Sequence, residues 1–295
     1  MGSLNTGSRK MADFVRIHEM GPRDGLQNEK RIIPTVDKIR LVDLLSACGF
    51  EKIEVTSFVR ADWVPQMADG AEVMAGIARW PGTLYTVLTP NMRGYEAAVA
   101  ASADEVAVFA SASEGFSHRN INCSIAESFE RFAPLVDSAR RDGIPVRAYV
   151  SCAIDCPFDG PTPPAQVARV AAQLHALGCG EVALADTIGT GTPDRVAAML
   201  DAVLEHMSAA SLAGHFHDTN GRALDNITVS LEKGLRVFDA AAGGLGGCPY
   251  APGAEGNVAT GKTVDHLHAL GFETRIDRDR LDEAEAFARG LRGAR

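Results

Sequence analysis

The sequence predicts an α/β fold: a closed (β/α)8 barrel of parallel strands, followed by a short C-terminal helical extension. Two observations support this prediction. Short apolar runs alternate with longer amphipathic runs, and eight such units follow one another at a spacing of roughly 30 residues, which is typical of parallel βαβ units. The chain has 295 residues, a length that suits a single barrel of this kind.

The predicted strands are short runs rich in apolar residues. Runs of this length that are bounded by turn residues favour buried strands. They cover residues 15–20, 52–58, 84–88, 105–110, 146–153, 181–186, 212–217 and 237–242.

The predicted helices lie between the strands and carry start and stop signals. Ser124 and Glu127 have the spacing of a capping box, and Thr192 followed by Pro193 is typical of a helix start. Glycines stand where several helices should end, at Gly49, Gly178, Gly234 and Gly271. The predicted helices cover residues 35–47, 124–141, 164–177, 192–207, 220–233 and 258–270, and residues 279–291 form the extension.

The organisation of the chain favours one domain. An open, doubly wound sheet is the alternative, but eight units without a dinucleotide-binding fingerprint favour closure into a barrel. No long linker divides the chain, so we expect residues 13–295 to form one catalytic barrel domain. Residues 1–12 have no apolar or Arg-rich segment. We expect a disordered leader or an expression remnant there, with Met11 as an alternative start.

Composition excludes several classes of protein. The net charge of −9 and the lack of a long basic run disfavour nucleic-acid binding. No apolar run approaches the ~20 residues that a membrane-spanning helix needs. The six cysteines are scattered without zinc-finger or Cys-x-x-Cys spacing, which favours free thiols in a reducing compartment. Because the sequence shows no secretion or organelle signal, we expect a cytoplasmic protein.

In such barrels, functional side chains lie at the carboxyl ends of the strands and in the loops that follow. His215 and His217 fall at the end of the seventh strand. Side chains two residues apart in a strand share one face, so we expect both imidazoles in one cavity, where they would form half of a metal site. Taken alone, a His-x-His pair is more often two ordinary histidines on a half-solvated strand, so further ligands must come from elsewhere.

Polar candidates also follow three other strands. Arg23 and Asp24 are adjacent in a turn after the first strand, although Gly and Pro residues alone would predict a plain turn here. Glu54 lies within the apolar second strand, where an ionised carboxylate is costly unless it is paired. We place Glu54 in the barrel lumen, with an outward surface position as the alternative. Asp186 ends the sixth strand, ahead of a helix N-terminus that could bind an anion.

A long glycine-rich loop, 243–257, follows the eighth strand. Loops of this length in a compact domain are usually functional, so we expect a mobile lid or binding loop. It carries Cys248 and Asn257 over the barrel mouth. A buried structural cysteine is the common alternative for Cys248, but a loop tip between glycines offers little core to fill.

Five segments stand out in this order: GPRDGLQN at 21–28, EVTSF at 54–58, DTIG at 186–189, HFHD at 215–218 and GLGGCPYAPG at 244–253. Together they resemble the 3-hydroxy-3-methylglutaryl-CoA lyase family, which belongs to the metallolyase group of TIM barrels. The resemblance extends over residues 15–270. The Arg-Asp pair and the His-x-His motif resemble those of the whole group, which includes Claisen-type synthases. The Cys248 loop and the segment 120–124 narrow the resemblance to the lyases.

The resemblance implies a divalent cation, Mg²⁺ or Mn²⁺, whose ligands would be Asp24, His215, His217 and Asn257. Mixed nitrogen and oxygen ligands agree with an octahedral ion that also accepts substrate oxygens. The implied reaction is a retro-Claisen cleavage of 3-hydroxy-3-methylglutaryl-CoA to acetyl-CoA and acetoacetate. Arg23 is expected to stabilise the enolate, and Cys248 is the expected acid/base, with His215 or Asp24 sharing the proton transfer.

The resemblance also implies supporting roles. Glu54 is expected to hold a metal-bound water or orient a ligand, and Glu19 is expected to support Arg23. Lys30 and Arg93 are the expected partners of the CoA phosphates across the barrel mouth. The expected partner is a small-molecule acyl-CoA substrate, and we expect the chain to form a homodimer.

Other functions stay open at this point. Residues 256–263, GNVATGKT, match the phosphate-binding loop of nucleotide hydrolases and kinases letter for letter. That motif should follow a buried strand, but here it follows a Pro- and Gly-rich segment. A non-catalytic CoA- or metal-binding module would be expected to lack Arg23 or Cys248. A Claisen-type synthase, or a lyase for a longer-branched 3-hydroxyglutaryl-CoA analogue, is the alternative within the same group.

Overall fold

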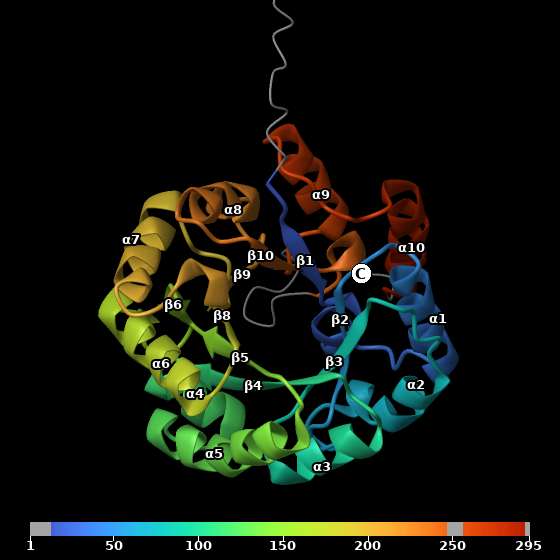
Figure 1. The fold of residues 1–295 in the computed structure, drawn as a ribbon, viewed down its shortest axis with the longest axis horizontal. Coiled ribbons are helices and arrows are strands. Elements are labelled where there is room, and N and C mark those ends of the chain that lie inside the picture. Colours follow the sequence, from blue (N-terminus) through green and yellow to red (C-terminus); the bar gives the residue numbers. More distant parts are fainter. Residues whose placement is uncertain (1–12, 247–255, 293–295) are drawn as a thin grey trace, which may run out of the picture.

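The computed structural model describes residues 13–246 and 256–292. Eight parallel strands form a closed barrel within a ring of helices, as the end-on view of Figure 1 shows. Around the barrel the strand order is β1-β10-β9-β8-β5-β4-β3-β2, and β1 pairs with both β10 and β2. The predicted (β/α)8 barrel is therefore confirmed, while the expected leader, 1–12, lies outside the described residues.

The barrel strands are four to seven residues long. They are β1 (Arg16–Glu19), β2 (Lys52–Ser57), β3 (Leu84–Leu88), β4 (Glu105–Ser111), β5 (Val146–Ser151), β8 (Glu181–Asp186), β9 (Leu212–Phe216) and β10 (Val237–Ala240). A small antiparallel pair, β6 (Asp155–Cys156) with β7 (Gly160–Pro161), lies outside the barrel and was not predicted.

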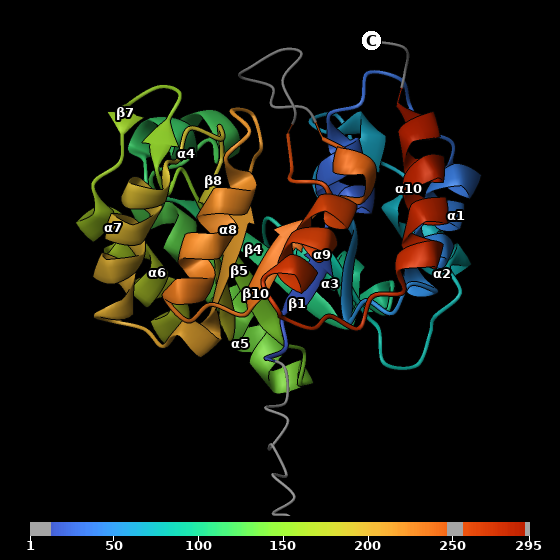
Figure 2. The same ribbon diagram turned by 90° about the horizontal axis from the view of Figure 1, so that it is seen from above.

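The described helices are α1 (Thr35–Ser46), α2 (Gly70–Gly76), α3 (Met92–Ala100), α4 (Glu114–Ile121), α5 (Ile125–Asp142), α6 (Pro164–Leu177), α7 (Pro193–Leu204), α8 (Ala223–Glu232), α9 (Thr260–Ala269) and α10 (Arg278–Leu291). The last of these is the predicted C-terminal extension, and it lies beside α1 in both Figure 1 and Figure 2. The predicted capping box of Ser124 and Glu127 is present at the start of α5. No helix in the described ranges is both long enough and apolar enough to cross a membrane.

Three helices, α2, α3 and α4, were not predicted. They have seven, nine and eight residues. A helical apolar period becomes visible only over windows of about 11–18 residues, so helices of two turns leave little signal.

Some element ends differ from the predicted ones for local reasons. β5 stops at Ser151 because Cys152 has a left-handed backbone with φ of 57°, which no strand accommodates. α8 begins at Ala223 and not at residue 220, because Gly221 has a left-handed backbone with φ of 67°. The Asp218 carboxylate then accepts a hydrogen bond from the Ala223 amide at 3.1 Å. α9 begins two residues late because Ala259 still pairs with Ala241.

Alternation along the strands points every second side chain into the barrel. A small apolar cluster fills part of this interior, and its members are Met20, Leu88, Ala107, Tyr149, Ala183, Ala213 and Val237. Barrel interiors are usually filled by bulky branched side chains, whereas three of these residues are alanines. The small side chains leave room for Arg147, which is fully buried.

Candidate active site

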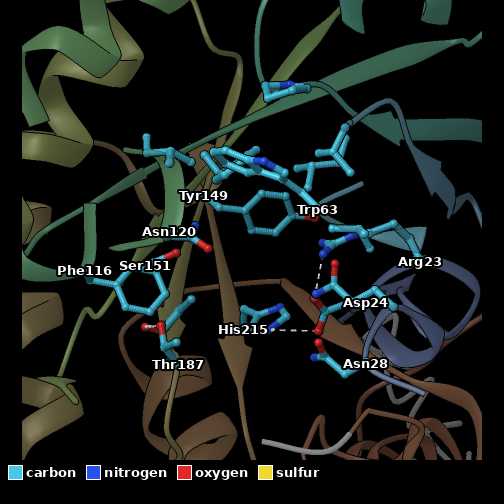
Figure 3. A pocket seen from close by; sticks show the side chains of 18 of the residues that line it. Arg23, Asp24, Asn28, Trp63, Phe116, Asn120, Tyr149, Ser151, Thr187 and His215 are labelled. Atoms are coloured by element: carbon cyan, nitrogen blue, oxygen red, sulfur yellow. Dashed lines mark hydrogen bonds and ion pairs between the residues drawn. The ribbon is translucent and has the colours of Figure 1, made fainter. Parts of the chain in front are cut away.

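A cavity of about 340 Å³ opens at the carboxyl ends of the barrel strands. Figure 3 shows Arg23 and Asp24 on one side of it and Phe116, Asn120 and Thr187 on the opposite side. A volume of this size is typical of small-molecule sites. Functional side chains were predicted at this end of the barrel, and the cavity lies there.

Three predicted metal ligands meet at the cavity. Donor atoms of Asp24, His215 and His217 all lie within 4.8 Å of one another. The Nε2 atom of His215 is 4.0 Å from Oδ2 of Asp24, and the two imidazole rings are 5.4 Å apart between centroids. Both imidazoles line the cavity, which confirms the orientation predicted from their spacing.

The backbone after β1 explains the position of Asp24. Residues Gly21–Gly25 form a π-helical turn, η1, in which the Gly25 amide donates to the Met20 carbonyl at 3.1 Å. Such widened turns are frequent at functional sites. Gln27 Nε2 donates to Asp24 Oδ1 at 2.9 Å, and Asn257 Nδ2 donates to Oδ2 at 2.7 Å. The carboxylate is therefore held from both sides.

Electrostatics keep this cluster in the protonation states that a cation needs. Burial opposes ionisation of Asp24, but the Arg23 guanidinium and the two imidazoles outweigh it and hold its pKa at about 2. Burial, followed by the neighbouring His215, lowers the pKa of His217 to about 4. At neutral pH the cluster therefore offers a carboxylate and a neutral imidazole of His217.

The donor set fits a divalent cation. Nδ1 of His217 is buried and has no hydrogen-bond partner in the described part of the chain. A buried polar atom without a partner is costly, and a bound cation would remove that cost at an imidazole nitrogen. One carboxylate and two imidazoles suit a cation that keeps positions for other oxygen ligands better than a closed structural zinc site.

Asn257 lies beside this cluster. Its side chain is 3% exposed, and its backbone pairs with that of His217. Asn257 therefore stands where an amide oxygen could complete the ligand set. The predicted acid/base, Cys248, lies outside the described residues.

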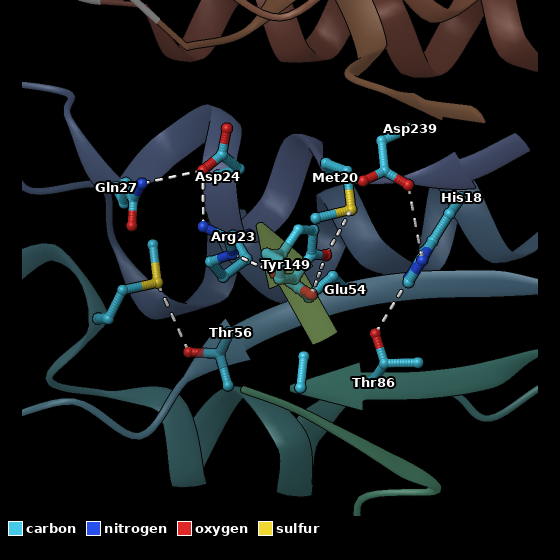
Figure 4. Close-up of polar contacts among 12 residues, drawn as sticks. His18, Met20, Arg23, Asp24, Gln27, Glu54, Thr56, Thr86, Tyr149 and Asp239 are labelled. Carbon is cyan, nitrogen blue, oxygen red and sulfur yellow. Dashed lines mark hydrogen bonds and ion pairs between the residues drawn. The ribbon is translucent and has the colours of Figure 1, made fainter. Parts of the chain in front are cut away.

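Arg23 is the buried cation of the site. Its Nε donates to Oε1 of Glu54, and its Nη1 lies 2.6 Å from Oδ1 of Asp24. Tyr149 donates its hydroxyl to the other oxygen of Glu54 at 2.7 Å, and the guanidinium lies 5.7 Å from the Tyr149 ring centroid. Figure 4 shows these contacts. Glu54 is fully buried in the barrel lumen, as expected, and its two oxygens accept hydrogen bonds from Arg23 and Tyr149.

Glu19 was expected to support Arg23, but its hydrogen bonds are to other residues. Its carboxylate accepts hydrogen bonds from the amides of Gly21 and Ala242 at 2.8 and 2.9 Å, and from the Thr260 hydroxyl at 2.7 Å. Within the described residues, the carboxylates paired with Arg23 are Glu54 and Asp24. The reason is strand alternation: neighbouring His18 and Met20 face the lumen, so Glu19 faces outward toward α9.

The predicted CoA partners are not among the residues that line the cavity. Lys30 and Arg93 are exposed, and neither lines it. Arg60 and Arg131 line the cavity instead. Arg93 lies in the first turn of α3, while its neighbours Pro90 and Asn91 reach the cavity wall. The contact of Lys30 and Arg93 with CoA therefore stays a prediction.

Asp186 has a structural role in its loop. Its carboxylate accepts hydrogen bonds from the Thr190 and Gly191 amides at 3.2 and 2.8 Å. These amides belong to the loop ahead of α7, which begins at Pro193. The anion site expected at the N-terminus of this helix stays a prediction.

Three side chains inside the barrel were missed. Arg147 and Tyr149 stand two residues apart on β5 and therefore share one face of the strand, and Asp239 lies on β10. Arg147 pairs with Asp239 at 2.7 Å, and Asp239 accepts from Nδ1 of His215 at 3.0 Å. The signal that placed Glu54 in the lumen, a polar residue within an apolar strand, is also present at these three positions.

The contacts of residues 256–263 give no support to the phosphate-binding loop interpretation. The segment directly before this motif, 247–255, lies outside the described residues. The amide of Gly261, which would contact a phosphate, donates to the Glu285 carboxylate at 2.8 Å. An anionic side chain thus takes the place of the anionic ligand.

Comparisons with known proteins agree with this geometry. The family model described as HMGL-like matches residues 14–287. The chain is 55% identical over 278 residues to a zebrafish (Danio rerio) cytoplasmic 3-hydroxy-3-methylglutaryl-CoA lyase, covering 94% of this chain and 83% of that protein. It is 53% identical over 273 residues to the chicken (Gallus gallus) mitochondrial hydroxymethylglutaryl-CoA lyase, covering 92% of each.

Solved structures show the same similarity. The HMG-CoA lyase from Brucella melitensis superposes with a TM-score of 0.95 at 64% identity, covering 95% of this chain and 99% of that chain. An HMG-CoA lyase from Acinetobacter baumannii, solved in complex with coenzyme A and 3-methylmalate, has a TM-score of 0.90 at 37% identity, covering 95% and 92%. The fold, the converging site residues and a family match over nearly the whole chain lead to one conclusion: this chain belongs to the HMGL-like family.

Proposed function

We propose that this protein is a divalent-metal-dependent carbon–carbon lyase that cleaves 3-hydroxy-3-methylglutaryl-CoA to acetyl-CoA and acetoacetate. The observation that carries the proposal is the placement of the buried Arg23 guanidinium next to a cluster of candidate cation ligands in this chain. Relatives of the same family are named 3-hydroxy-3-methylglutaryl-CoA lyases, which supports the same activity here. A retro-Claisen cleavage needs both features, because it deprotonates a hydroxyl and releases an electron pair into an enolate.

Asp24, His215, His217 and Asn257 would hold the cation, Mg²⁺ or Mn²⁺. When bound, the cation supplies Lewis-acid chemistry that makes the substrate C3 hydroxyl more acidic. A base takes the hydroxyl proton, and the electron pair of the broken O–H bond forms the new C3=O π bond as the C2–C3 bond breaks. Acetoacetate leaves, and the released pair becomes the enolate of acetyl-CoA.

Arg23 is the proposed partner of the enolate oxygen. Glu54 and Asp24 hold its guanidinium in place and Tyr149 holds Glu54, so the positive charge is preorganised before substrate binds. Preorganised charge in a site shielded from water stabilises a developing anion strongly. Cys248 is the proposed acid that protonates C2 of the enolate, with His215 or Asp24 sharing the proton transfer.

The CoA portion would cross the barrel mouth. Trp63 and Arg60 line the cavity there, and the Trp63 side chain is 56% exposed. We propose that the cations Arg60 and Arg131 contact the CoA phosphates, in addition to Lys30 and Arg93 further out. We also propose that the chain forms a homodimer. A cytoplasmic location is a further proposal, since the similar proteins include both cytoplasmic and mitochondrial enzymes.

The test is direct. Purified protein is incubated with 3-hydroxy-3-methylglutaryl-CoA and Mg²⁺, with and without a chelator, and acetoacetate is measured. We expect acetoacetate only when the cation is available. A longer-branched 3-hydroxyglutaryl-CoA analogue is tested in parallel, and faster cleavage of that analogue would replace the proposed substrate. Acetoacetate production that persists in excess chelator would contradict the metal-dependent mechanism.

A further inference from the structure

His215 makes a second contact on the side of its ring away from Asp24. Its Nδ1 lies 3.0 Å from Oδ2 of Asp239, while its Nε2 faces Oδ2 of Asp24 at 4.0 Å. Asp239 and His215 are register partners on the neighbouring strands β10 and β9. The Asp239 side chain is fully buried, so water does not compete for this hydrogen bond. The ring is therefore held between two carboxylates, one inside the barrel and one at the proposed cation site.

Asp239 is itself clamped. Arg147 donates to both of its oxygens, at 2.7 Å from Nη2 and 3.2 Å from Nη1. Two parallel bonds of this kind fix the plane of a carboxylate as well as its position. Arg147 is in turn held by Glu181 at 2.7 Å from Nε and lies 4.7 Å from the Tyr149 ring centroid. Side chains from three barrel strands, β5, β8 and β10, thus fix the position of one carboxylate.

The clamp has a chemical consequence for His215. A carboxylate accepts hydrogen bonds, so the imidazole must carry its proton on Nδ1, and the lone pair then lies on Nε2. That nitrogen is the one that faces Asp24. His217 has no equivalent contact: its Nδ1 lacks a hydrogen-bond partner among the residues that the structure describes.

We propose that Asp239, clamped by Arg147, is a positioning residue that presets His215 to bind the cation through Nε2. The inference rests on the proposed metal-dependent function and extends it to two residues deep in the barrel. Outer carboxylates that orient a ligating histidine typically contribute about 10–100-fold to metal affinity.

The competing explanation is that Arg147 and Asp239 form a purely structural ion pair. Glu181 separates the two explanations, because it contacts the same guanidinium but belongs to no contact of His215. A structural role predicts similar consequences for Asp239→Asn and Glu181→Gln. A positioning role predicts a loss of metal affinity for Asp239→Asn and affinity near that of the wild type for Glu181→Gln.

The experiment measures Mn²⁺ affinity of the full chain by electron paramagnetic resonance, with folding checked by circular dichroism. Asp239→Asn removes one of the two carboxylates paired with the buried Arg147, so the double variant Arg147→Met/Asp239→Asn is measured beside it to remove the remaining imbalance of charge at Asp239. We expect both to bind Mn²⁺ about 10–100-fold more weakly than the wild type. In metal-free protein, nitrogen-15 histidine spectra should show the Nδ1–H tautomer of His215, and a mixture of tautomers in the double variant.

The possible outcomes are distinguishable. Unchanged Mn²⁺ affinity in the folded double variant overturns the inference and leaves the proposed function intact. Equal losses in the Asp239→Asn and Glu181→Gln variants also overturn it, in favour of a structural ion pair. A wild-type protein that binds no Mn²⁺ overturns the proposed function itself, and the inference with it.

Discussion

The charged residues inside the barrel are paired one to another. Arg23 lies between Glu54 and Asp24, and Arg147 lies between Asp239 and Glu181. An unpaired charge in such an interior would lower the free energy of unfolding by several kcal/mol. Substituting one member of a pair therefore destabilises the protein through the charged partner that remains buried. The effect of such a substitution on turnover must therefore be measured separately from its effect on folding.

Replacing the buried guanidinium should affect the chemical step. We expect Arg23→Met to raise the barrier by about 3–6 kcal/mol, because the enolate oxygen loses a full positive charge, and this corresponds to a fall in kcat of about 10²–10⁴-fold. The measurement is steady-state turnover of 3-hydroxy-3-methylglutaryl-CoA, with folding verified by circular dichroism. Arg195→Met is the control, because Arg195 pairs with Asp155 outside the cavity lining. A folded Arg23→Met enzyme with near-normal turnover would remove Arg23 from the mechanism.

Glu19 should make stability depend on pH. Burial raises its pKa from the ordinary 4.5 to about 7, although hydrogen bonds from Thr260, Ala242 and Gly21 oppose the rise. Between these two values the unfolded chain releases a proton that the folded protein keeps, so stability is lost as pH rises from 4.5 to 7. The loss is on the order of 3 kcal/mol.

Glu19→Gln removes this titration and keeps the shape of the side chain. We expect the free energy of unfolding of the variant, relative to the wild type, to increase across this pH range by that amount. Denaturant titrations at several pH values measure it, and other titrating groups cancel in the difference. Parallel pH curves for the two proteins would show that Glu19 is not the responsible group.

At the scale of elements, the strand period decides which side chains reach the cavity. On β9 and the residue after it, Ala213, His215 and His217 face inward, and Phe216 faces the outer core. On β1, the same alternation directs Glu19 outward. Arg23 lies beyond the strand and reaches the lumen from the π-helical turn η1. The position of η1 therefore controls the site.

Contact between η1 and Leu245 gives a way to test this control. A Cβ added at Gly25 would lie 2.6 Å from Leu245 Cβ, so one of the two segments must move. We expect Gly25→Ala to cost about 1–3 kcal/mol of stability through overpacking and to lower kcat by displacing Asp24. Thermal unfolding and steady-state kinetics measure the two effects. Gly180→Ala is the matched control because an added Cβ there has no neighbour within 4 Å. If both variants behave alike, the contact with Leu245 does not position the turn.

At the scale of the whole molecule, the site exists only when the barrel is closed. Asp24 follows β1, and His215 lies on β9, which is separated from β1 by β10. A cation held by both would bind the folded chain and not the unfolded one. Binding to the folded state alone adds stability by mass action.

We therefore expect Mn²⁺ at 100 times its Kd to add about 2.7 kcal/mol to the free energy of unfolding. The increase should appear as a rise of several degrees in Tm that a chelator reverses. Asp24→Asn should lose this rise, whereas Asp186→Asn should keep it, because Asp186 binds its own loop and lies outside the ligand cluster. A Tm that is indifferent to Mn²⁺ in the wild type would contradict the ligand assignment.

Much of this architecture was predictable. The eight strands and the longer helices have clear periods and caps, and the His-x-His spacing alone places His215 and His217 on one face. The lumen position of Glu54 followed from the cost of an ionised group in an apolar strand. Helices of two turns were missed because their period is too short to recognise. Arg147, Tyr149 and Asp239 were missed although they carry the same signal as Glu54.

By itself, the sequence determined the barrel, the face of each strand that points inward and the family to which the chain belongs. Only the tertiary structure decided which inward side chains meet: Arg23 with Glu54, and His215 with Asp239. The physical reason is that local periodicity specifies a face but not a neighbour. Neighbours are set by the register between strands and by the stagger that closes the barrel, and both depend on contacts between residues far apart in the chain.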